Sequence, residues 1–254
     1  MDDELGGKTF VLATDLDGTF LGGSAEDRRT LYDWIEENRD SIGLIFVTGR
    51  DPGFIADLCK DGVPWPDYVV GDVGTTIARM RDGMQSPMPE LEAEIAAAWD
   101  DAGERVRDAL RDAPGLTLQS TDFRYRVSYD LDAATFERDA IDRIDALGLD
   151  HLISDNRYFD VLPPGISKGP SLKRLVAHLG VPPDRVLAAG DTLNDLSMIE
   201  CGLPAVVVGG AEQALVDRVA PLRHVHIAEA RGAGGIMEAI RVLDLHPALW
   251  SDTP

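Results

Sequence analysis

The chain has 254 residues, of which 44% are hydrophobic and 27% charged, a composition typical of a folded globular protein. Its length suits one large domain or a core with one inserted domain. Lysine and arginine number 24 and aspartate and glutamate 45, so the formal net charge is −21. Such an acidic surface repels nucleic-acid phosphates and anionic lipid, and we expect no nucleic-acid partner and no membrane partner.

Cysteine content and the N-terminal residues predict the compartment. Cys59 and Cys201 are too few and too far apart for a disulfide framework or a zinc site. No apolar run approaches the roughly 18 residues of a membrane span, and the acidic start Met1-Asp-Asp-Glu-Leu5 lacks the regions of a signal peptide. We expect a cytoplasmic protein, either a monomer or a weak homodimer.

Short apolar runs alternate with amphipathic helical patterns along most of the chain. The runs that predict strands are 9–14, 42–47, 68–70, 185–189 and 205–208. The patterns that predict helices are 26–38, 51–60, 169–179, 193–201 and 212–219. Continuous apolar runs are typical of strands buried on both faces of a parallel sheet. The alternation predicts a doubly wound, Rossmann-like α/β core whose ligand site lies beyond the carboxyl ends of the strands.

The stretch 81–162 breaks this alternation. It begins with a turn-rich segment, 82–89, which we interpret as a linker, and a long acidic helix pattern follows over 90–111. Further along, the patterns predict strands at 117–119, 123–131, 151–154 and 158–162, and a helix over 133–147. This order predicts an antiparallel sheet with helices on one face. We therefore predict a core made of residues 1–80 and 163–254, with an inserted α+β cap domain at 81–162.

Aromatic and basic residues alternate in the predicted strand 123–131. One face carries Phe123, Tyr125, Val127 and Tyr129, and the other carries Arg124, Arg126 and Ser128. The aromatic face suits either the core of the cap or a platform for a sugar ring. The two arginines suit either a substrate-facing wall or a solvated sheet face.

Two carboxylates stand two residues apart where the first strand ends, in Asp15-Leu-Asp17. The pair suits phosphoryl transfer through an aspartyl-phosphate, in which one carboxylate attacks phosphorus and the other protonates the leaving oxygen. A hard divalent cation such as Mg²⁺ would offset the repulsion between carboxylates and phosphate. These residues alone do not decide which aspartate attacks.

Other polar residues also follow predicted strands. Asp191, Asn194 and Asp195 come after 185–189 and suit either a metal's oxygen shell or the cap of the next helix. Thr48 follows 42–47 and suits either a phosphate cradle or a helix N-cap. Lys168, just before a helix, suits either a point charge for phosphate or an ordinary surface lysine.

These segments, in this order, resemble the four motifs of the haloacid dehalogenase-like superfamily of aspartate-nucleophile phosphohydrolases. The matching residues are Asp15-Leu-Asp17-Gly-Thr19, Thr48-Gly-Arg50, Lys168 and Gly190-Asp191-Thr-Leu-Asn194-Asp195. The predicted insert lies between the second and third motifs, where the larger α/β caps of this superfamily sit. Within it, the chain is most similar to sucrose-phosphatase-like enzymes, through Asp72-Val-Gly-Thr-Thr-Ile77, Tyr125-Arg-Val-Ser-Tyr129 and Asp160-Val-Leu-Pro-Pro-Gly-Ile-Ser-Lys168.

The resemblance implies a role for each matched residue. It implies that Asp15 is the nucleophile and Asp17 the general acid/base. It also implies that Mg²⁺ is held by the Asp15 carboxylate, the Asp17 backbone carbonyl and the Asp191 side chain, with Asp195 supporting the metal. The phosphate-binding residues would be Thr48, Gly49, Lys168 and Asn194, and the candidates for contact with the rest of the substrate are Arg50, Arg124 and Arg126.

The resulting prediction is a Mg²⁺-dependent phosphatase that cleaves a phosphomonoester of a small sugar or sugar derivative through an aspartyl-phosphate. The candidate substrates are sucrose 6-phosphate or another disaccharide phosphate, an amino-sugar phosphate and a glycosylglycerate phosphate. A phosphosugar mutase of the same superfamily and a non-catalytic phospholigand-binding protein are the alternatives. Asp17 argues against a dehalogenase, since the dehalogenases lack an aspartate there. The sequence also lacks the Gly-x-Gly-x-x-Gly of a dinucleotide-binding oxidoreductase after its first strand, and it lacks a P-loop.

Overall fold

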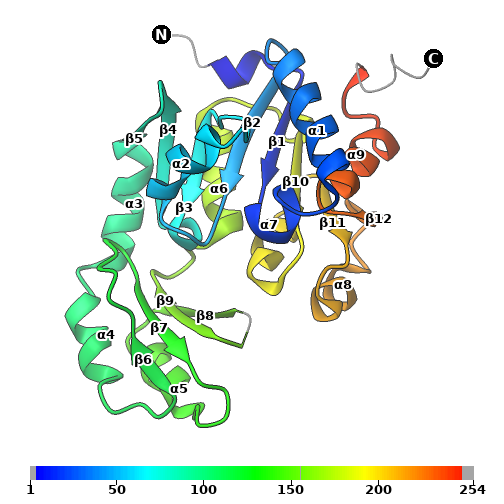
Figure 1. Cartoon of the computed structure of the whole chain (residues 1–254). Helices are drawn as coiled ribbons and strands as arrows, with labels where there is room; N and C mark the ends of the chain where they lie inside the picture. Colours follow the sequence, from blue (N-terminus) through cyan, green and yellow to red (C-terminus); the bar gives the residue numbers. More distant parts are fainter. Residues whose placement is uncertain (1–3, 155, 248–254) are drawn as a thin grey trace.

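The computed structural model describes residues 4–154 and 156–247. Within these ranges the chain forms one eight-stranded sheet and one four-stranded sheet. Figure 1 shows the large sheet with helices on both faces and the small sheet beyond one end of its strands.

The large sheet has the order β12-β11-β10-β1-β2-β3-β4-β5. Neighbours from β12 to β3 pair in parallel, whereas β3 with β4 and β4 with β5 pair antiparallel. Every residue of β1 and β2 is buried, as their continuous apolar sequence predicts. The predicted doubly wound α/β core is therefore confirmed. Its strands are β1 (Phe10–Thr14), β2 (Ile42–Val47), β3 (Tyr68–Gly71), β4 (Thr76–Arg81), β5 (Met84–Pro87), β10 (Val186–Gly190), β11 (Ala205–Gly209) and β12 (Val225–Arg231).

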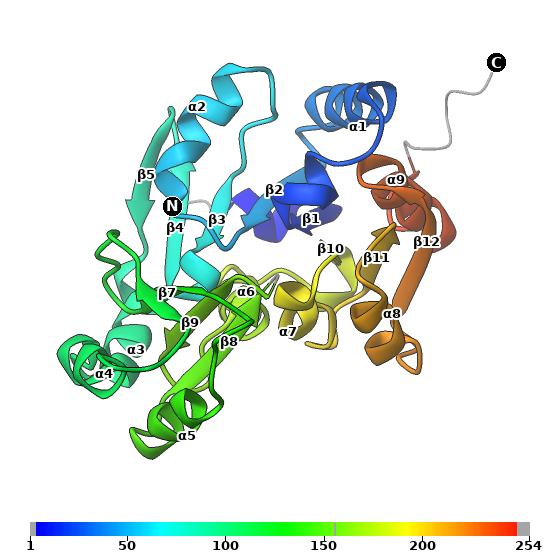
Figure 2. The same ribbon diagram turned by 60° about the horizontal axis from the view of Figure 1, so that its bottom comes forward.

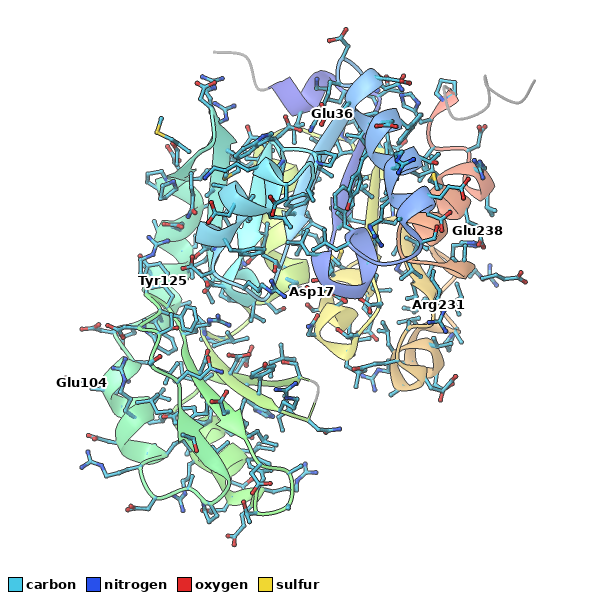
Figure 3. The ribbon with its side chains drawn as sticks, viewed as in Figure 1. Asp17, Glu36, Glu104, Tyr125, Arg231 and Glu238 are labelled. Carbon is cyan, nitrogen blue, oxygen red and sulfur yellow. The ribbon has the colours of Figure 1, made fainter. Side chains whose placement is uncertain are left out.

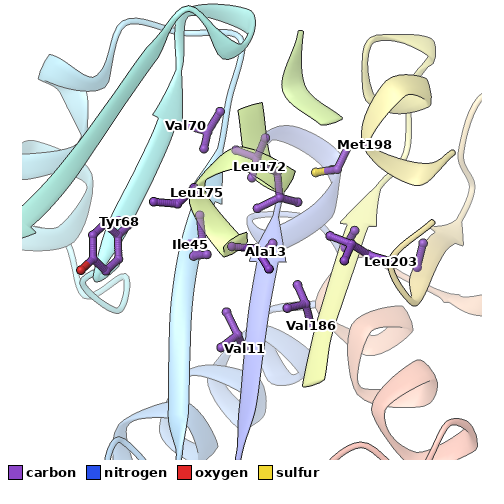
Figure 4. Close-up of a cluster of buried hydrophobic side chains, with 14 of the residues drawn as sticks. Val11, Ala13, Ile45, Tyr68, Val70, Leu172, Leu175, Val186, Met198 and Leu203 are labelled. Carbon is purple, nitrogen blue, oxygen red and sulfur yellow. The ribbon is translucent and has the colours of Figure 1, made fainter. Parts of the chain in front are cut away.

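Helices cover both faces of this sheet, as Figure 2 shows, and they bury apolar side chains against it. One face is covered by α1 (Ala25–Glu37), α2 (Ile55–Lys60) and α9 (Ala233–Val242). The other is covered by α3 (Pro89–Trp99), α6 (Lys168–His178), α7 (Leu196–Ile199) and α8 (Gln213–Val219). Figure 4 shows part of this second layer, where Leu172 and Leu175 of α6 lie close to Ala13 and Ile45, in one apolar cluster with Val11.

Short turns connect these elements. Five are 3₁₀ turns of the described chain: η1 (Glu4–Gly7), η3 (Pro52–Phe54), η4 (Asp72–Gly74), η5 (Pro183–Arg185) and η6 (Leu193–Asp195). The turn η2 (Leu16–Phe20) directly follows β1 and has non-helical backbone angles at Asp17 and Gly18. Because η2, η4 and η6 each follow a buried strand, they place polar residues at one edge of the sheet.

The small sheet is antiparallel, with the order β6-β7-β9-β8. Alternate residues of β7 and β9, such as Tyr129 and Phe159, pack with two helices around one apolar cluster. The predicted antiparallel sheet with helices on one face is present, while the division into domains at residues 81 and 163 stays a prediction. The elements are α4 (Gly103–Ala109), β6 (Leu116–Leu118), β7 (Val127–Leu131), α5 (Asp139–Ala146), β8 (Asp150–Ser154) and β9 (Tyr158–Leu162).

The long helix predicted over 90–111 is wrong, because the structure has two helices there, α3 and α4. Asp100 and Asp101 between them have φ angles of 47° and 52°. Aspartate tolerates this left-handed conformation better than most residues, and the conformation ends a right-handed helix. The break lets Trp99 and Ala102 both enter the apolar cluster of the small sheet.

The linker predicted over 82–89 is also wrong. Asp82 and Gly83, with φ angles of 51° and 75°, form the tight turn of a hairpin that joins β4 to β5. Asp-Gly is a favoured pair for such two-residue turns, because both positions need positive φ. The hairpin belongs to the large sheet and so crosses the predicted domain boundary at residue 81.

Two further differences concern irregular and C-terminal segments. The predicted strand 123–131 begins only at Val127, and the predicted helix 133–147 begins only at Asp139. The Asp132 carboxylate accepts hydrogen bonds from the Ala134 backbone and the Thr135 hydroxyl, which favours a local turn before the helix. The strand β12 and the helix α9 were not predicted.

Candidate active site

The candidate site lies at the carboxyl end of β1, between β10 and β2, where the order of strands along the sheet changes direction. From β1 the sheet extends through β2 to β5 on one side and through β10 to β12 on the other. Asp15 directly follows β1, and its backbone N–H donates to the Ala189 carbonyl of β10 at 2.9 Å. Such a switch point opens a crevice at the carboxyl ends of the strands. Figure 3 labels Asp17 at this end of the core, facing the small sheet.

A buried ammonium group joins three of the predicted motifs. Lys168 Nζ donates to Asp15 Oδ1 at 2.7 Å, to Asn194 Oδ1 at 2.8 Å and to Asp195 Oδ1 at 2.7 Å. Lys168 is fully buried, and these three acceptors use all three of its N–H groups. The residues predicted from separate segments of the sequence therefore converge on one point.

In the fourth motif, residues 190–195, backbone N–H groups hold the Asp195 carboxylate in place. Asp195 Oδ2 accepts from the N–H groups of Asp191 at 3.0 Å and of Thr192 at 3.1 Å. The Asp191 carboxylate accepts from the Thr19 hydroxyl at 2.7 Å, which links it to the loop after β1. Both Asp195 oxygens are thus engaged by the protein, so Asp195 positions Lys168 and the Asp191 backbone.

Asp17 lies apart from this buried cluster. Its side chain is 57% exposed and accepts from Arg50 Nη2 at 2.7 Å. The Arg50 guanidinium also lies over the Phe54 ring, 5.1 Å from its centre. Both Asp17 and Arg50 line the cavity described below.

Thr48 and Gly49 follow β2 and line the same cavity. The Thr48 side chain is buried, and its hydroxyl oxygen accepts from the Arg50 N–H at 3.1 Å. Among the described residues the Thr48 hydroxyl forms no hydrogen bond as a donor, so its hydrogen can be donated to a ligand oxygen.

Glycines explain why these loops approach so closely. A Cβ on Gly18, whose φ is 81°, would lie 2.2 Å from Asp191 Oδ2. A Cβ on Gly74, whose φ is 102°, would lie 2.4 Å from the Ser167 carbonyl carbon, beside Lys168. Both positions need a residue without a side chain, for the backbone conformation and for the space.

Burial changes the acid–base behaviour of the cluster. Burial raises the pKa of Asp15 to about 8, and the nearby Lys168 opposes part of this rise. Burial likewise raises the pKa of Asp191 to about 6. For Lys168, burial acts to lower the pKa, but the carboxylates of Asp15 and Asp195 raise it above its usual value. The cluster carries more negative charge than Lys168 balances.

The residues present fit a divalent cation. Oxygen atoms of Asp15, Asp191 and Asp195 all lie within 4.8 Å of one another. When ionised, these three carboxylates and Lys168 leave two negative charges, which matches one divalent ion. Oxygen donors of this kind are those that Mg²⁺ prefers. The Asp17 carboxylate is not part of this cluster, and the Asp17 backbone carbonyl stays a predicted ligand.

A cavity of about 540 Å³ lies over the cluster and reaches the small sheet. Its core side includes the predicted residues Asp15, Asp17, Thr48, Gly49, Arg50, Lys168 and Asn194, and its small-sheet side includes Gln119, Thr121, Phe123, Arg126, Ser154, Tyr158 and Asp160. The cavity volume suits a small ligand.

The two predicted cap arginines differ in placement. Arg126 lines the cavity. Arg124 pairs with both oxygens of Glu92 on α3, at 2.9 and 2.7 Å, and is not among the lining residues. Of the aromatic stripe, Tyr129 packs inside the small sheet's apolar cluster, whereas Phe123 lines the cavity. Phe123 and Arg126, predicted on opposite faces of a strand, line the same cavity because residues 123–126 are not part of the strand.

Sequence reasoning missed Asp160 and Asp72 as parts of the site. Asp160 lies on β9 and Asp72 lies in η4, and both side chains are buried. Asp72 has a φ of 52° and the next residue, Val73, a φ of 59°. Positive φ is rare for a β-branched residue, and such strained backbone concentrates at functional sites. The signal available in the sequence was an aspartate inside an otherwise apolar strand, Tyr158-Phe-Asp-Val-Leu162. None of the described helices is long and apolar enough to cross a membrane.

Residues 8–244 match the family model of Sucrose-6F-phosphate phosphohydrolase. Glucosylglycerol-phosphate synthase of Pseudomonas anguilliseptica is 38% identical over 231 residues, which cover 90% of this chain and 30% of the synthase. The chain thus spans under a third of that relative's length. Mannosylfructose-phosphate phosphatase of Agrobacterium fabrum is 28% identical over 248 residues, covering 93% of this chain and 98% of that protein.

The fold is similar to a solved sucrose-phosphatase from Synechocystis, in complex with sucrose and phosphate. The TM-score is 0.83, with 23% identity, 93% of this chain covered and 98% of the other. The two structures therefore share one fold over most of both chains.

Proposed function

The chain belongs to the sucrose-6F-phosphate phosphohydrolase family, and from this premise we propose that it hydrolyses the phosphomonoester of a small sugar or sugar derivative. Names of relatives support the substrate class: a mannosylfructose-phosphate phosphatase and a glucosylglycerol-phosphate synthase both handle phosphorylated sugar compounds. The individual sugar stays open among the disaccharide, amino-sugar and glycosylglycerate phosphates.

The placement of Asp15 supports this proposal most directly. Asp15 lines the cavity, its Oδ1 lies 2.7 Å from Lys168 Nζ, and a carboxylate oxygen of Asp191 lies within 4.8 Å of one of Asp15. A carboxylate held at a fixed point beside cationic groups is suited to attack a phosphorus atom whose oxygens those groups bind. Thr48 and the Gly49 backbone border the same space and would bind the phosphate oxygens.

The proposed Mg²⁺ would be held by Asp15 and Asp191, with the Asp17 carbonyl as a further ligand and Asp195 behind them. When bound, it would supply positive charge that offsets the repulsion between the carboxylates and a phosphate dianion. All three N–H groups of Lys168 donate to protein acceptors in this structure. A bound phosphate would therefore have to replace one of these acceptors.

The proposed chemistry has two steps. In the first, an Asp15 oxygen attacks phosphorus, the P–O bond to the sugar breaks, and Asp17 gives its proton to the leaving oxygen. In the second, water attacks phosphorus, Asp17 accepts the water's proton, and the bond between phosphorus and Asp15 breaks to release inorganic phosphate. Asp17 reaches the leaving group because its side chain lies on the open side of the site, where Arg50 holds it.

We further propose that the part of residues 81–162 that forms the small sheet and its helices acts as a cap that selects the leaving group. Ser154 of β8, Asp160 of β9 and Arg126, which directly precedes β7, line the cavity from this side. A cap over the cavity would exclude water from the first step and hold the leaving sugar.

Phosphate release tests this function. We expect the protein to liberate inorganic phosphate from one or a few sugar phosphates when Mg²⁺ is present, in a panel that also contains nucleotide and amino-acid phosphates. Activity should disappear in excess EDTA and return when Mg²⁺ is restored. Full turnover in EDTA would contradict the metal requirement. Conversion of the substrate to an isomeric phosphate without phosphate release would favour a mutase, and ligand binding without any turnover would favour a binding protein.

A further inference from the structure

A glutamate outside the four motifs holds the loop that carries Asp191. The Glu212 carboxylate accepts from the backbone N–H of Leu193 at 2.9 Å, through Oε2. The Glu212 backbone N–H donates to the Asp191 carbonyl, also at 2.9 Å. One residue therefore contacts the backbone of the fourth motif through both its side chain and its main chain, on either side of Thr192.

The topology of the large sheet explains why Glu212 meets this loop. The strands β10 and β11 are parallel neighbours, so their carboxyl ends lie at the same edge of the sheet. After β11 the chain turns sharply, with a φ of 84° at Gly210 and a hydrogen bond from the Ala211 N–H to the Val208 carbonyl at 3.3 Å. Glu212 follows this turn as the residue directly before α8, next to the loop that follows β10.

Two carboxylates together bind the backbone N–H groups of residues 191–193. Asp195 Oδ2 accepts from the first two of these groups, and Glu212 Oε2 accepts from the third. Asp195 belongs to the same motif as the groups that it binds, whereas Glu212 comes from the segment after β11. Glu212 therefore anchors the loop to a separate element of the fold.

This anchoring bears on the Asp191 carboxylate. Its Oδ1 accepts from the Thr19 hydroxyl at 2.7 Å, and one of its oxygens lies within 4.8 Å of oxygens of Asp15 and Asp195. The direction of a side chain depends on the backbone that carries it, so a loop held at its carbonyl and its N–H groups restricts where this carboxylate can lie. Groups that hold metal ligands in this way tune the affinity for the metal.

We propose that Glu212 is a positioning residue of the metal site, whose hydrogen bond to the Leu193 N–H holds the Asp191 carboxylate in place for a divalent cation. The inference rests on the proposed Mg²⁺ site. It adds a residue that none of the four matched motifs contains.

The charge of Glu212 is a second way in which this residue can act on Asp191. Burial is the main cause that raises the pKa of Asp191 to about 6, and the Glu212 carboxylate adds to the rise. A negative charge near the site would attract a cation even without the hydrogen bond. The experiment therefore has to separate the hydrogen bond from the charge.

Two substitutions make this separation. Glu212→Gln removes the charge but keeps a side-chain oxygen that can accept from the Leu193 N–H, whereas Glu212→Ala removes both. We expect the Kd for Mg²⁺ to rise about 10-fold in Glu212→Ala, the lower end of the range for groups that hold metal ligands, because this hydrogen bond is exposed to solvent. In Glu212→Gln the Kd should rise by no more than about 3-fold, as for loss of an exposed charge.

The affinity is measured without substrate, from the free energy of unfolding at increasing Mg²⁺ concentrations, which rises as RT ln(1 + [Mg²⁺]/Kd). Glu104→Ala is the matched control, because Glu104 is an exposed glutamate at the start of α4, which like α8 has seven residues. It should leave the Kd unchanged. The Mg²⁺ concentration for half-maximal phosphate release should rise in Glu212→Ala by the same factor as the Kd.

Other outcomes would overturn the proposal. A wild-type Kd in Glu212→Ala, with lower stability of the metal-free protein, would show that Glu212 only supports the start of α8. Equal weakening in Glu212→Ala and Glu212→Gln would assign the effect to charge and reject the hydrogen bond. If Mg²⁺ does not stabilise the wild-type protein, the proposed metal site itself fails, and this inference fails with it.

Discussion

Asp15→Asn is expected to lower kcat for phosphate release by about 10³-fold or more, because the variant lacks the carboxylate proposed to form the bond to phosphorus. Asparagine keeps the size of the side chain and an oxygen that can still accept from Lys168, which donates to Asp15 at 2.7 Å in the structure. The fold should therefore persist. Phosphate release with saturating Mg²⁺, together with circular dichroism and thermal unfolding of the variant, measures both expectations.

Asp17→Asn is the informative comparison. If Asp17 is the general acid/base and Asp15 the nucleophile, Asp17→Asn should still form the aspartyl-phosphate from a substrate with a good leaving group, such as p-nitrophenyl phosphate. Mass spectrometry after acid quenching should then detect a phosphorylated protein in Asp17→Asn and none in Asp15→Asn. Phosphorylation of Asp15→Asn, or near wild-type turnover by it, would contradict the assignment of the nucleophile.

The part of the site on the core could be predicted from the sequence because each element of it has a local signal. Asp15, Thr48 and Asp191 directly follow buried apolar strands, and parallel strands bring their carboxyl ends to one edge of a sheet. The order of the motifs then places Lys168 among them. What the sequence could not show is that Lys168 is completely buried and already bonded to Asp15, Asn194 and Asp195. That depends on tertiary packing.

The small-sheet side of the cavity could not be predicted in the same way. Arg124 and Arg126 lie on one face of the predicted strand 123–131, but both precede β7, which begins at Val127, so the alternation of a strand does not place them. Arg124 meets Glu92 of α3, while Arg126 meets Asp160 of β9. Both partners are distant in sequence, so neither pairing has a local signal. The same holds for the break between α3 and α4, which burial of Trp99 and Ala102 favours over a continuous helix.

Lys168→Met is expected to destabilise the metal-free protein by about 3–5 kcal/mol, the range seen when one partner of a buried ion pair is removed. Lys168 is the buried cation bonded to both Asp15 and Asp195, and its loss leaves a group of carboxylates without it. Phosphate release should also be lost. The measurement is urea unfolding in EDTA, with Lys173→Met on the exposed side of the same helix as the matched control.

The stability lost in Lys168→Met is expected to depend on pH. Burial raises the pKa of Asp15 from 3.8 to about 8, so the native state binds the proton more tightly than the unfolded state. Metal-free stability therefore declines as pH rises through this interval. Lys168 is among the groups that lower the pKa of Asp15, so its removal should extend the decline to higher pH. The deficit of Lys168→Met relative to Lys173→Met should be larger at about pH 9 than at about pH 6.

Added Mg²⁺ should recover part of that deficit, because an ion bound by the carboxylates stabilises the native state by mass action and replaces the missing positive charge. In the wild-type protein the same addition should raise the unfolding midpoint more at alkaline than at acidic pH, since protons compete for the same oxygens. A deficit that is independent of pH and of Mg²⁺ would mean that Lys168 stabilises the fold by packing alone. It would then be wrong to treat the ammonium group as the local counter-charge of the aspartate cluster.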